Sequence, residues 1–153
     1  MSHSFGSDEY FMQQALNQAM NAEEEGEVPV GAIVVSENRI IAKAYNQTEK
    51  LNDVTAHAEI LALTSAFNYL GAKYLPECTL YVTLEPCTMC AGALYWSQLG
   101  RLVIGAKDDK RGYNRLVSEG ENVLHPKTEV VYGVLEEPCK AIVSNFFRKL
   151  RKK

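Results

Sequence analysis

The sequence predicts an α/β protein of one domain, built as a three-layer α/β/α sandwich around a mixed five-stranded sheet. The chain has 153 residues, and single domains usually fall at about 100–150. Apolar β-branched runs alternate with helical patterns in the order α-β-β-α-β-α-β-β-α. A hairpin followed by strand–helix–strand units favours a mixed sheet with helices on both faces.

The first half of the chain predicts a helix, a hairpin and a second helix. The first helix runs from Ser7 or Asp8 to about Glu25, with its apolar residues on one face and Gly26 at its end. Strands at 30–35 and 40–45 follow, and the polar segment 36–39 is a hairpin turn. The second helix spans about 56–70, with Thr55 as a candidate N-cap and Gly71 as the C-cap glycine.

The second half predicts strand–helix–strand units and a final helix. A strand at 78–84 leads into a third helix at about 88–98, which stops near Gly100. Strands are expected at 102–105 and 129–134, and the last helix at about 137–149. The segment 107–122 between them is polar and contains glycine, so we expect a loop or a short helix there. All elements belong to one domain, residues 1–153.

The composition is that of an ordinary globular protein, with 46% hydrophobic residues, 23% charged residues and a net charge of −3. The first residues are polar rather than an apolar leader, and no run approaches the roughly 20 apolar residues of a membrane span. We therefore expect a cytoplasmic protein with reduced thiols and no membrane contact. In that setting a Cys-x-x-Cys pair indicates metal or redox chemistry before a structural disulfide.

Charge is unevenly distributed along the chain. A basic tail occupies about 148–153, and an acidic run occupies 23–25. Such runs are usually solvated surface. A basic tail of this kind also suits contact with a nucleic-acid backbone.

Two segments carry the residues with catalytic potential: TAHAE at 55–59 and TLEPCTMC at 83–90. Together they read H-x-E … P-C-x-x-C. A hydrolytic zinc site needs three protein ligands and one open position, and His57, Cys87 and Cys90 supply that set. The two cysteines are three residues apart at a helix start, so their sulfurs face one side. The positive end of that helix favours thiolates.

Glu59 is expected to carry the proton rather than to bind the metal. It lies two residues beyond His57, which on a regular helix is a rotation of about 200°. At the first turn its carboxylate reaches the pocket beside the metal. There it can take a proton from a metal-activated water and pass it to a substrate nitrogen.

A Cys-x-x-Cys pair alone is also found in redox proteins and in structural zinc sites, which need a fourth Cys or His. The spare cysteines are Cys78, expected in the core at the far end of its strand, and Cys139, expected to be a small buried residue. His3 and His125 are expected at a terminus and in a loop. The full pattern therefore favours catalytic zinc.

The chain resembles the bacterial tRNA-specific adenosine deaminases of the cytidine deaminase superfamily, whose zinc signature is H-x-E … P-C-x-x-C. Similar segments occur along nearly the whole chain: 27–32, Asn46, 55–59, 79–93 and 144–148. The resemblance implies a cytidine deaminase-like fold and a homodimer with one zinc ion per subunit. It also implies conversion of adenosine to inosine at the wobble position of a tRNA anticodon.

By position, the resemblance assigns zinc binding to His57, Cys87 and Cys90, and the proton shuttle to Glu59. It implies that zinc-bound hydroxide attacks C6 of adenine and that ammonia leaves. The positions that match the family's substrate contacts are Asn46 at the target nucleoside; Val30, Ala58 and Pro86 in the pocket wall; Asp108 and Lys110 in an RNA-facing loop; and Phe146, Phe147 and Arg148 on the last helix. Such a site suits splayed single-stranded bases, which stack on aromatic side chains while arginines meet phosphates. Phe146 equally suits the core of its helix.

The segment 108–116 departs from the family pattern, which has a small glycine- and serine-rich run after the fourth strand. Here Tyr113 and Arg115 are bulkier. They either provide stacking and phosphate contacts or reshape the groove that takes the RNA.

The main alternative is a guanine deaminase acting on the free base, which shares the zinc pattern. Residues 28–31, 83–84 and the Phe146-Phe147-Arg148 ending favour the tRNA enzyme instead. A riboflavin-pathway deaminase would have a longer insert between the cysteines, and a cytidine deaminase would have a cysteine in place of His57. A non-catalytic, zinc-stabilised RNA-binding subunit would lack the proton shuttle, which Glu59 supplies. Tyr95-Trp96 suits a dimer interface or a core.

Overall fold

A computed structural model describes residues 3–118 and 120–152. The strands are β1 (Gly31–Ser36), β2 (Arg39–Tyr45), β3 (Cys78–Leu84), β4 (Arg101–Ala106) and β5 (Glu129–Tyr132). The helices are α1 (Asp8–Glu24), α2 (Ala58–Leu70), α3 (Thr88–Trp96) and α4 (Glu136–Arg151), with a 3₁₀ turn at Tyr113–Leu116. The order of elements is the one that the sequence predicts.

The strands form one mixed sheet in the order β2-β1-β3-β4-β5. β1 is antiparallel to β2 and to β3, whereas β3, β4 and β5 are parallel to one another. Glu37 and Asn38 form the two-residue hairpin turn with φ of 52° and 61°, the left-handed conformations that tight hairpins require. The prediction of a mixed five-stranded α/β fold is confirmed.

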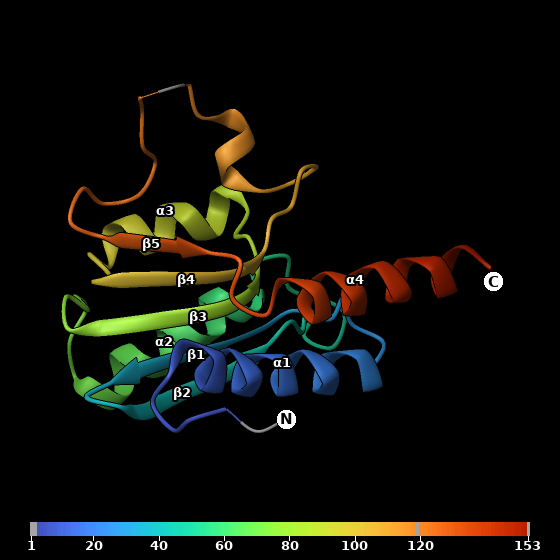
Figure 1. Ribbon diagram of the computed structural model, residues 1–153, viewed down its shortest axis with the longest axis horizontal. Coiled ribbons are helices and arrows are strands. Elements are labelled where there is room, and N and C mark those ends of the chain that lie inside the picture. Colours follow the sequence, from blue (N-terminus) through green and yellow to red (C-terminus); the bar gives the residue numbers. More distant parts are fainter. Residues whose placement is uncertain (1–2, 119, 153) are drawn as a thin grey trace.

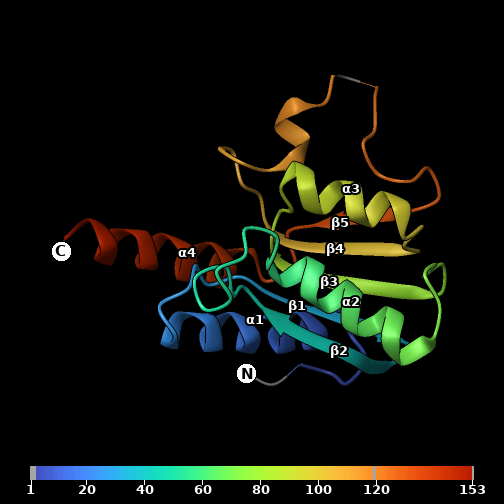
Figure 2. The ribbon, with the colours of Figure 1, turned by 180° about the vertical axis from the view of Figure 1, so that it is seen from behind.

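Helices cover both faces of the sheet. α1 and α4 lie on one face (Figure 1), and α2 and α3 lie on the other (Figure 2). Each face buries its own apolar cluster. Leu63 of α2, Leu80 of β3 and Leu94 of α3 belong to the cluster on one face. Phe11 of α1, Ile33 of β1 and Val103 of β4 belong to the cluster on the other face. Alternate residues of a strand point to opposite faces, so a strand such as β1, which is covered on both sides, is apolar along nearly its whole length.

The start of α2 is two residues later than the sequence predicts. His57, not Thr55, is the N-cap, with extended backbone at φ −77° and ψ 153°. The backbone N and the hydroxyl of Thr55 both donate to Asp53 Oδ1, at 2.8 and 2.7 Å. Thr55 is therefore part of a local Asx-type turn and is not available as a cap. Gly71 ends the helix in the left-handed conformation, as predicted.

A polar network ties α1 to three strands at the end of the sheet remote from the cysteines of α3. Asp8 accepts two hydrogen bonds of 2.7 Å from the guanidinium of Arg101 and one of 2.8 Å from the hydroxyl of Tyr81. Arg101 also donates to Glu129. The bond from Arg101 lowers the pKa of Asp8. Within the described residues, no helix combines the length and apolar character needed to cross a membrane.

Candidate active site

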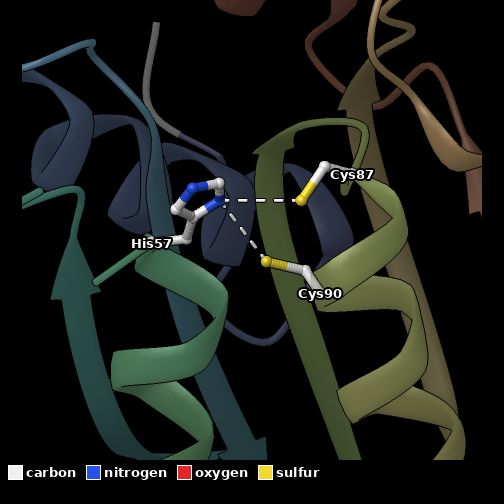
Figure 3. Close-up of side chains that lie close together, drawn as sticks. All are labelled: His57, Cys87 and Cys90. Atoms are coloured by element: carbon white, nitrogen blue, oxygen red, sulfur yellow. Dashed lines mark hydrogen bonds between the residues drawn. The ribbon is translucent and has the colours of Figure 1, made fainter. Parts of the chain in front are cut away.

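The starts of α2 and α3 bring together the three side chains of a candidate metal centre. His57 is the N-cap of α2, Cys87 is the N-cap of α3, and Cys90 lies in the first turn of α3. The two helices lie on the same face of the sheet, and their first turns are neighbours (Figure 2). Consequently the imidazole and the two sulfurs point toward one another (Figure 3).

The geometry of this group fits a tetrahedral zinc ion. His57 Nδ1 lies 3.7 Å from Cys87 Sγ and 3.6 Å from Cys90 Sγ. Zn–N and Zn–S bonds of about 2.05 and 2.3 Å at a tetrahedral angle place the nitrogen and sulfur about 3.6 Å apart. In residues 3–118 and 120–152, this is the only group of three Cys, His or acidic side chains close enough to share a metal. Cys78 and Cys139 are buried in the core, as expected.

The two thiols influence each other. A hydrogen bond with Cys90 lowers the pKa of Cys87 to about 3, and the same bond raises the pKa of Cys90. A hydrogen bond to Cys87 raises the pKa of His57. One thiolate is therefore already favoured, and a cation bound between the sulfurs would favour the second because metals bind the deprotonated form.

Glu59 is buried beside the group and lines the pocket in front of it. Burial raises the pKa of its carboxyl group to about 7, a value suited to proton transfer at neutral pH. Because His57 is an N-cap outside the regular helix, the argument from a rotation of about 200° per two helical residues does not apply to this pair. Glu59 is not among the described side chains that are close enough to share the metal, and its separate role stays a prediction.

A pocket with a volume of about 220 Å³ opens in front of these residues. This is smaller than the roughly 300–1,000 Å³ of sites for drug-sized ligands, so it suits one heterocyclic base. Its lining consists of Val28, Val30, Asn46, Thr48, His57, Ala58, Glu59, Leu84, Glu85, Cys87, Asp108 and Arg111. Four of the predicted substrate contacts are therefore pocket residues: Val30, Asn46, Ala58 and Asp108.

The other predicted contacts lie outside the pocket. Pro86 is buried and is not among the lining residues, and its carbonyl oxygen accepts a hydrogen bond of 2.9 Å from the backbone N of Tyr113. Lys110 is exposed on the loop after β4. Phe147 and Arg148 lie on α4, whose C-terminal end projects beyond the sheet (Figures 1 and 2).

The sequence analysis missed five lining residues: Val28, Thr48, Leu84, Glu85 and Arg111. Glu85 could have been identified from its place directly before Pro86 and Cys87, because an acidic side chain that is buried beside a metal-binding segment needs hydrogen-bond partners. Arg111 follows Lys110, which was expected to face RNA, but its place in the pocket depends on the path of the loop. Nothing in the local pattern distinguishes Val28, Thr48 or Leu84.

Two buried glutamates hold the loops on either side of the pocket. The carboxylate of Glu27 accepts hydrogen bonds from the backbone N–H groups of Glu49 and Lys50, at 3.1 and 2.8 Å. Glu85 does the same for two backbone N–H groups of the loop after β4. Neither carboxylate has a cationic partner among the described residues. These backbone donors satisfy buried charge in place of a counter-ion.

The exposure of several aromatic side chains decides between the two interpretations that the sequence left open for them. Tyr113 is 3% exposed and cannot stack on RNA in this conformation, whereas Arg115 is exposed. Tyr95 and Trp96 are 37% and 75% exposed, which excludes the core interpretation. Phe146 and Phe147 contact each other edge-to-face at 5.4 Å.

Phe146 and Phe147 are half-buried and belong to neither apolar cluster. The core interpretation of Phe146 is therefore not supported. The tail residues 148–152 are exposed, and Lys153 lies outside the described residues.

A His/Cys/Cys group beside a buried glutamate, at the first turns of two helices on a mixed α/β sheet, is the arrangement of a zinc-dependent nucleobase deaminase site. The chain matches the family of MafB19-like deaminases over residues 6–151. It is 47% identical over 148 residues to the tRNA-specific adenosine deaminase of Bacillus subtilis, covering 95% of this chain and 92% of that protein. The chain belongs to the tRNA-specific adenosine deaminase family.

Solved structures agree with this placement. A structure from a study of A-to-I editing by tRNA:A34 deaminases at the wobble position of transfer RNA is 43% identical, with a TM-score of 0.81. The alignment covers 87% of this chain and 98% of that one. The guanine deaminase of Nitrosomonas europaea is 26% identical with a TM-score of 0.75, over 95% of this chain and 87% of that one.

Proposed function

We propose that this enzyme deaminates adenosine to inosine at the wobble position of a tRNA anticodon, with one zinc ion per subunit. The observation that carries the chemistry is the His57, Cys87 and Cys90 group, at 3.6–3.7 Å from nitrogen to sulfur, directly beside buried Glu59. The substrate is supported by near full-length similarity to a tRNA-specific enzyme at 47% identity.

The residues of the pocket have distinct tasks in this reaction. His57, Cys87 and Cys90 would hold the zinc ion, which would supply Lewis-acid activation of the attacking water. Glu59 would move the two protons of the attacking water in turn, one to N1 of the base and one to the amino group on C6, so that the C6–O bond forms, the C6–N bond breaks and ammonia leaves. Asn46, which is 7% exposed and lines the pocket, can hydrogen-bond the nucleoside. Val30 and Ala58 form apolar walls against the base.

The substrate base is presented by an RNA loop, and the basic end of α4 is suited to meet its phosphates. Five of the last six residues of the chain are lysine or arginine. α4 projects past the sheet and presents this charge on its exposed last turns. We also propose that the reaction takes place in the cytoplasm.

We also propose that the enzyme is a homodimer. Trp96 and Tyr95 pack edge-to-face at 5.3 Å on the surface at the end of α3, and Met89 is exposed on the same helix. Exposed aromatic and Met side chains are enriched at protein–protein interfaces. Trp96→Asp should shift the mass measured by sedimentation from dimer to monomer; a wild-type monomer would contradict the proposal.

The decisive assay compares two substrates with the same purified protein: an anticodon stem-loop carrying a wobble adenosine, and free guanine. We expect inosine from the stem-loop and no xanthine from guanine. The guanine alternative is supported by the structural similarity to the Nitrosomonas enzyme, and activity on guanine alone would overturn our choice of substrate. A stem-loop with guanosine at the wobble position is the matched control, because only the reacting base differs.

The contribution of the tail can be measured through salt dependence. For single strands, each phosphate contact contributes about −0.7 to the slope of log K against log salt. Replacing the five basic residues of 148–153 with Gln keeps the length of the chain and should reduce the magnitude of the slope by up to about 3.5. An unchanged slope would indicate that the tail is solvated surface and makes no contact with phosphates.

A further inference from the structure

The loop 107–112, between β4 and the 3₁₀ turn, forms one side of the pocket mouth. It contributes Asp108 and Arg111 to the lining. Arg111 makes no ion pair with any residue that the structure describes. The loop is polar, and the 3₁₀ turn that follows it departs from the small-residue pattern of the family at Tyr113. Contacts with residues outside the loop hold it in this conformation.

Glu85 supplies the first of these contacts. Its side chain is buried, and its Oε1 accepts from the backbone N of Asp108 at 3.1 Å while its Oε2 accepts from the backbone N of Asn114 at 3.0 Å. Gly112 lies against the same carboxyl group, since a Cβ there would be 2.4 Å from the Glu85 Cδ. One carboxylate thus binds the start of the loop and the 3₁₀ turn that follows it, and it leaves no room for a side chain at Gly112 between them.

Tyr113 supplies the second set of contacts. Its backbone N donates to the Pro86 carbonyl oxygen at 2.9 Å. Its ring is buried, and its hydroxyl lies 2.8 Å from the hydroxyl of Tyr132 on β5. Lys107, at the start of the loop, places its Nζ 5.2 Å from the centre of the Tyr132 ring, within the range of a cation–π contact. The tyrosine pair therefore anchors the loop to an edge strand of the sheet.

We propose that Glu85 and the Tyr113–Tyr132 pair are positioning residues that hold the pocket-mouth loop in its binding conformation before substrate arrives. A loop ordered in advance spares the binding step the entropy of ordering it. Weakening these contacts therefore raises KM and leaves kcat and metal binding unchanged. The inference rests on the proposed function for its kinetic consequence, but the order of the loop is a property of the free protein.

The test uses Tyr113→Phe, Tyr132→Phe and the double variant. Each removes the same hydroxyl contact without changing the ring. We expect KM to rise by about 2- to 10-fold, the factor that corresponds to one neutral hydrogen bond, with kcat within 2-fold of wild type. Because a single contact is lost in every case, the double variant should match the single ones. The substrate is whichever of the stem-loop and guanine the wild type deaminates.

Tyr81→Phe is the matched control. It also removes one buried phenol contact of 2.8 Å, to Asp8, but on the α1 face of the sheet. It should lower stability without changing KM. If it raises KM as much as Tyr113→Phe does, the effect is general loss of stability and the inference is wrong.

Hydrogen exchange in the free protein provides a second measurement that does not depend on the substrate. The amides of Asp108 and Asn114 should exchange faster in Tyr113→Phe and in Glu85→Gln, in which one acceptor oxygen becomes an NH₂ group. Glu27→Gln makes the same change at the opposite loop and should leave these two amides unchanged. Unchanged exchange in both loop variants, or a fall in kcat together with zinc loss, would overturn the inference. Failure of the wild type on the stem-loop would refute only the proposed tRNA substrate.

Discussion

Replacing Glu59 with Gln should abolish nearly all turnover while zinc stays bound. The change keeps the shape of the side chain but removes its capacity to accept and return a proton. General acid–base catalysis contributes about 10²- to 10⁴-fold to rate. The pocket determines where in this range the loss falls, because a neighbouring carboxylate could otherwise take over the task.

The other two carboxylates among the described pocket residues are largely engaged by the backbone. Both oxygens of Glu85 accept backbone hydrogen bonds, and Asp108 Oδ1 accepts from the backbone N–H groups of Lys110 and Arg111. Glu59 is 3% exposed, so bulk water does not reach its position freely. We therefore expect the upper part of the range, about 10³- to 10⁴-fold in kcat, or about 4–5.5 kcal/mol of transition-state stabilisation.

The assay is single-turnover deamination of the wobble-adenosine stem-loop, with zinc per subunit measured on the same protein by mass spectrometry. Glu129→Gln is the control, since it makes the same chemical change at an exposed carboxylate whose partner is Arg101. A loss below 10-fold would show that another group moves the proton. Loss of zinc from Glu59→Gln would show that Glu59 supports the metal and that its role has been misassigned.

Three further outcomes are expected from the fold and the metal group. Cys90→Ser should lose zinc, and added zinc should raise the Tm of metal-stripped wild type but not of the variant. The contact with Arg101 holds the pKa of Asp8 below its ordinary value. Asp8 therefore stabilises the fold above about pH 4, and this contribution is lost as the pH falls through the lowered pKa. When unfolding is measured across an acid titration, Asp8→Asn should show a shallower loss of stability than the wild type. Gly31→Ala should lower the free energy of unfolding by about 3 kcal/mol or more, because its Cβ would lie 2.0 Å from a backbone oxygen of α1. Gly92→Ala, with no atom within 4 Å of its Cβ, is the control in urea titrations and should stabilise α3 by about 0.5–1 kcal/mol.

The sequence predicted most of the fold because its signals are local. Apolar β-branched runs and helical stretches ended by Gly26 and Gly71 depend on neighbours a few residues away. The start of α2 was misplaced because two candidate caps, Thr55 and His57, stand two residues apart. The side chain of Asp53 engages Thr55, and the presence of a local turn of this kind is not visible in helix propensity.

The candidate metal group was predictable for a chemical reason. One imidazole and two thiols at short, helix-start spacings satisfy the ligand count of zinc, and few other arrangements use those residues in that order. The pocket rim was not predictable in the same way. Val28, Thr48 and Arg111 become pocket residues through loops whose paths depend on the backbone contacts of Glu27 and Glu85.

By itself, then, the sequence determined the α/β class, the order of elements and the candidate ligands His57, Cys87 and Cys90. Only the tertiary structure decided which side chains line the pocket and that Tyr113 is anchored to Tyr132 instead of facing RNA. The reason is physical. Helix starts and ligand sets are specified by residues close together in the chain. The mouth of the pocket instead depends on contacts between residues far apart in the sequence: Tyr113 and Tyr132 of β5 are 19 residues apart, and Asn114 and Glu85, directly after β3, are 29 residues apart.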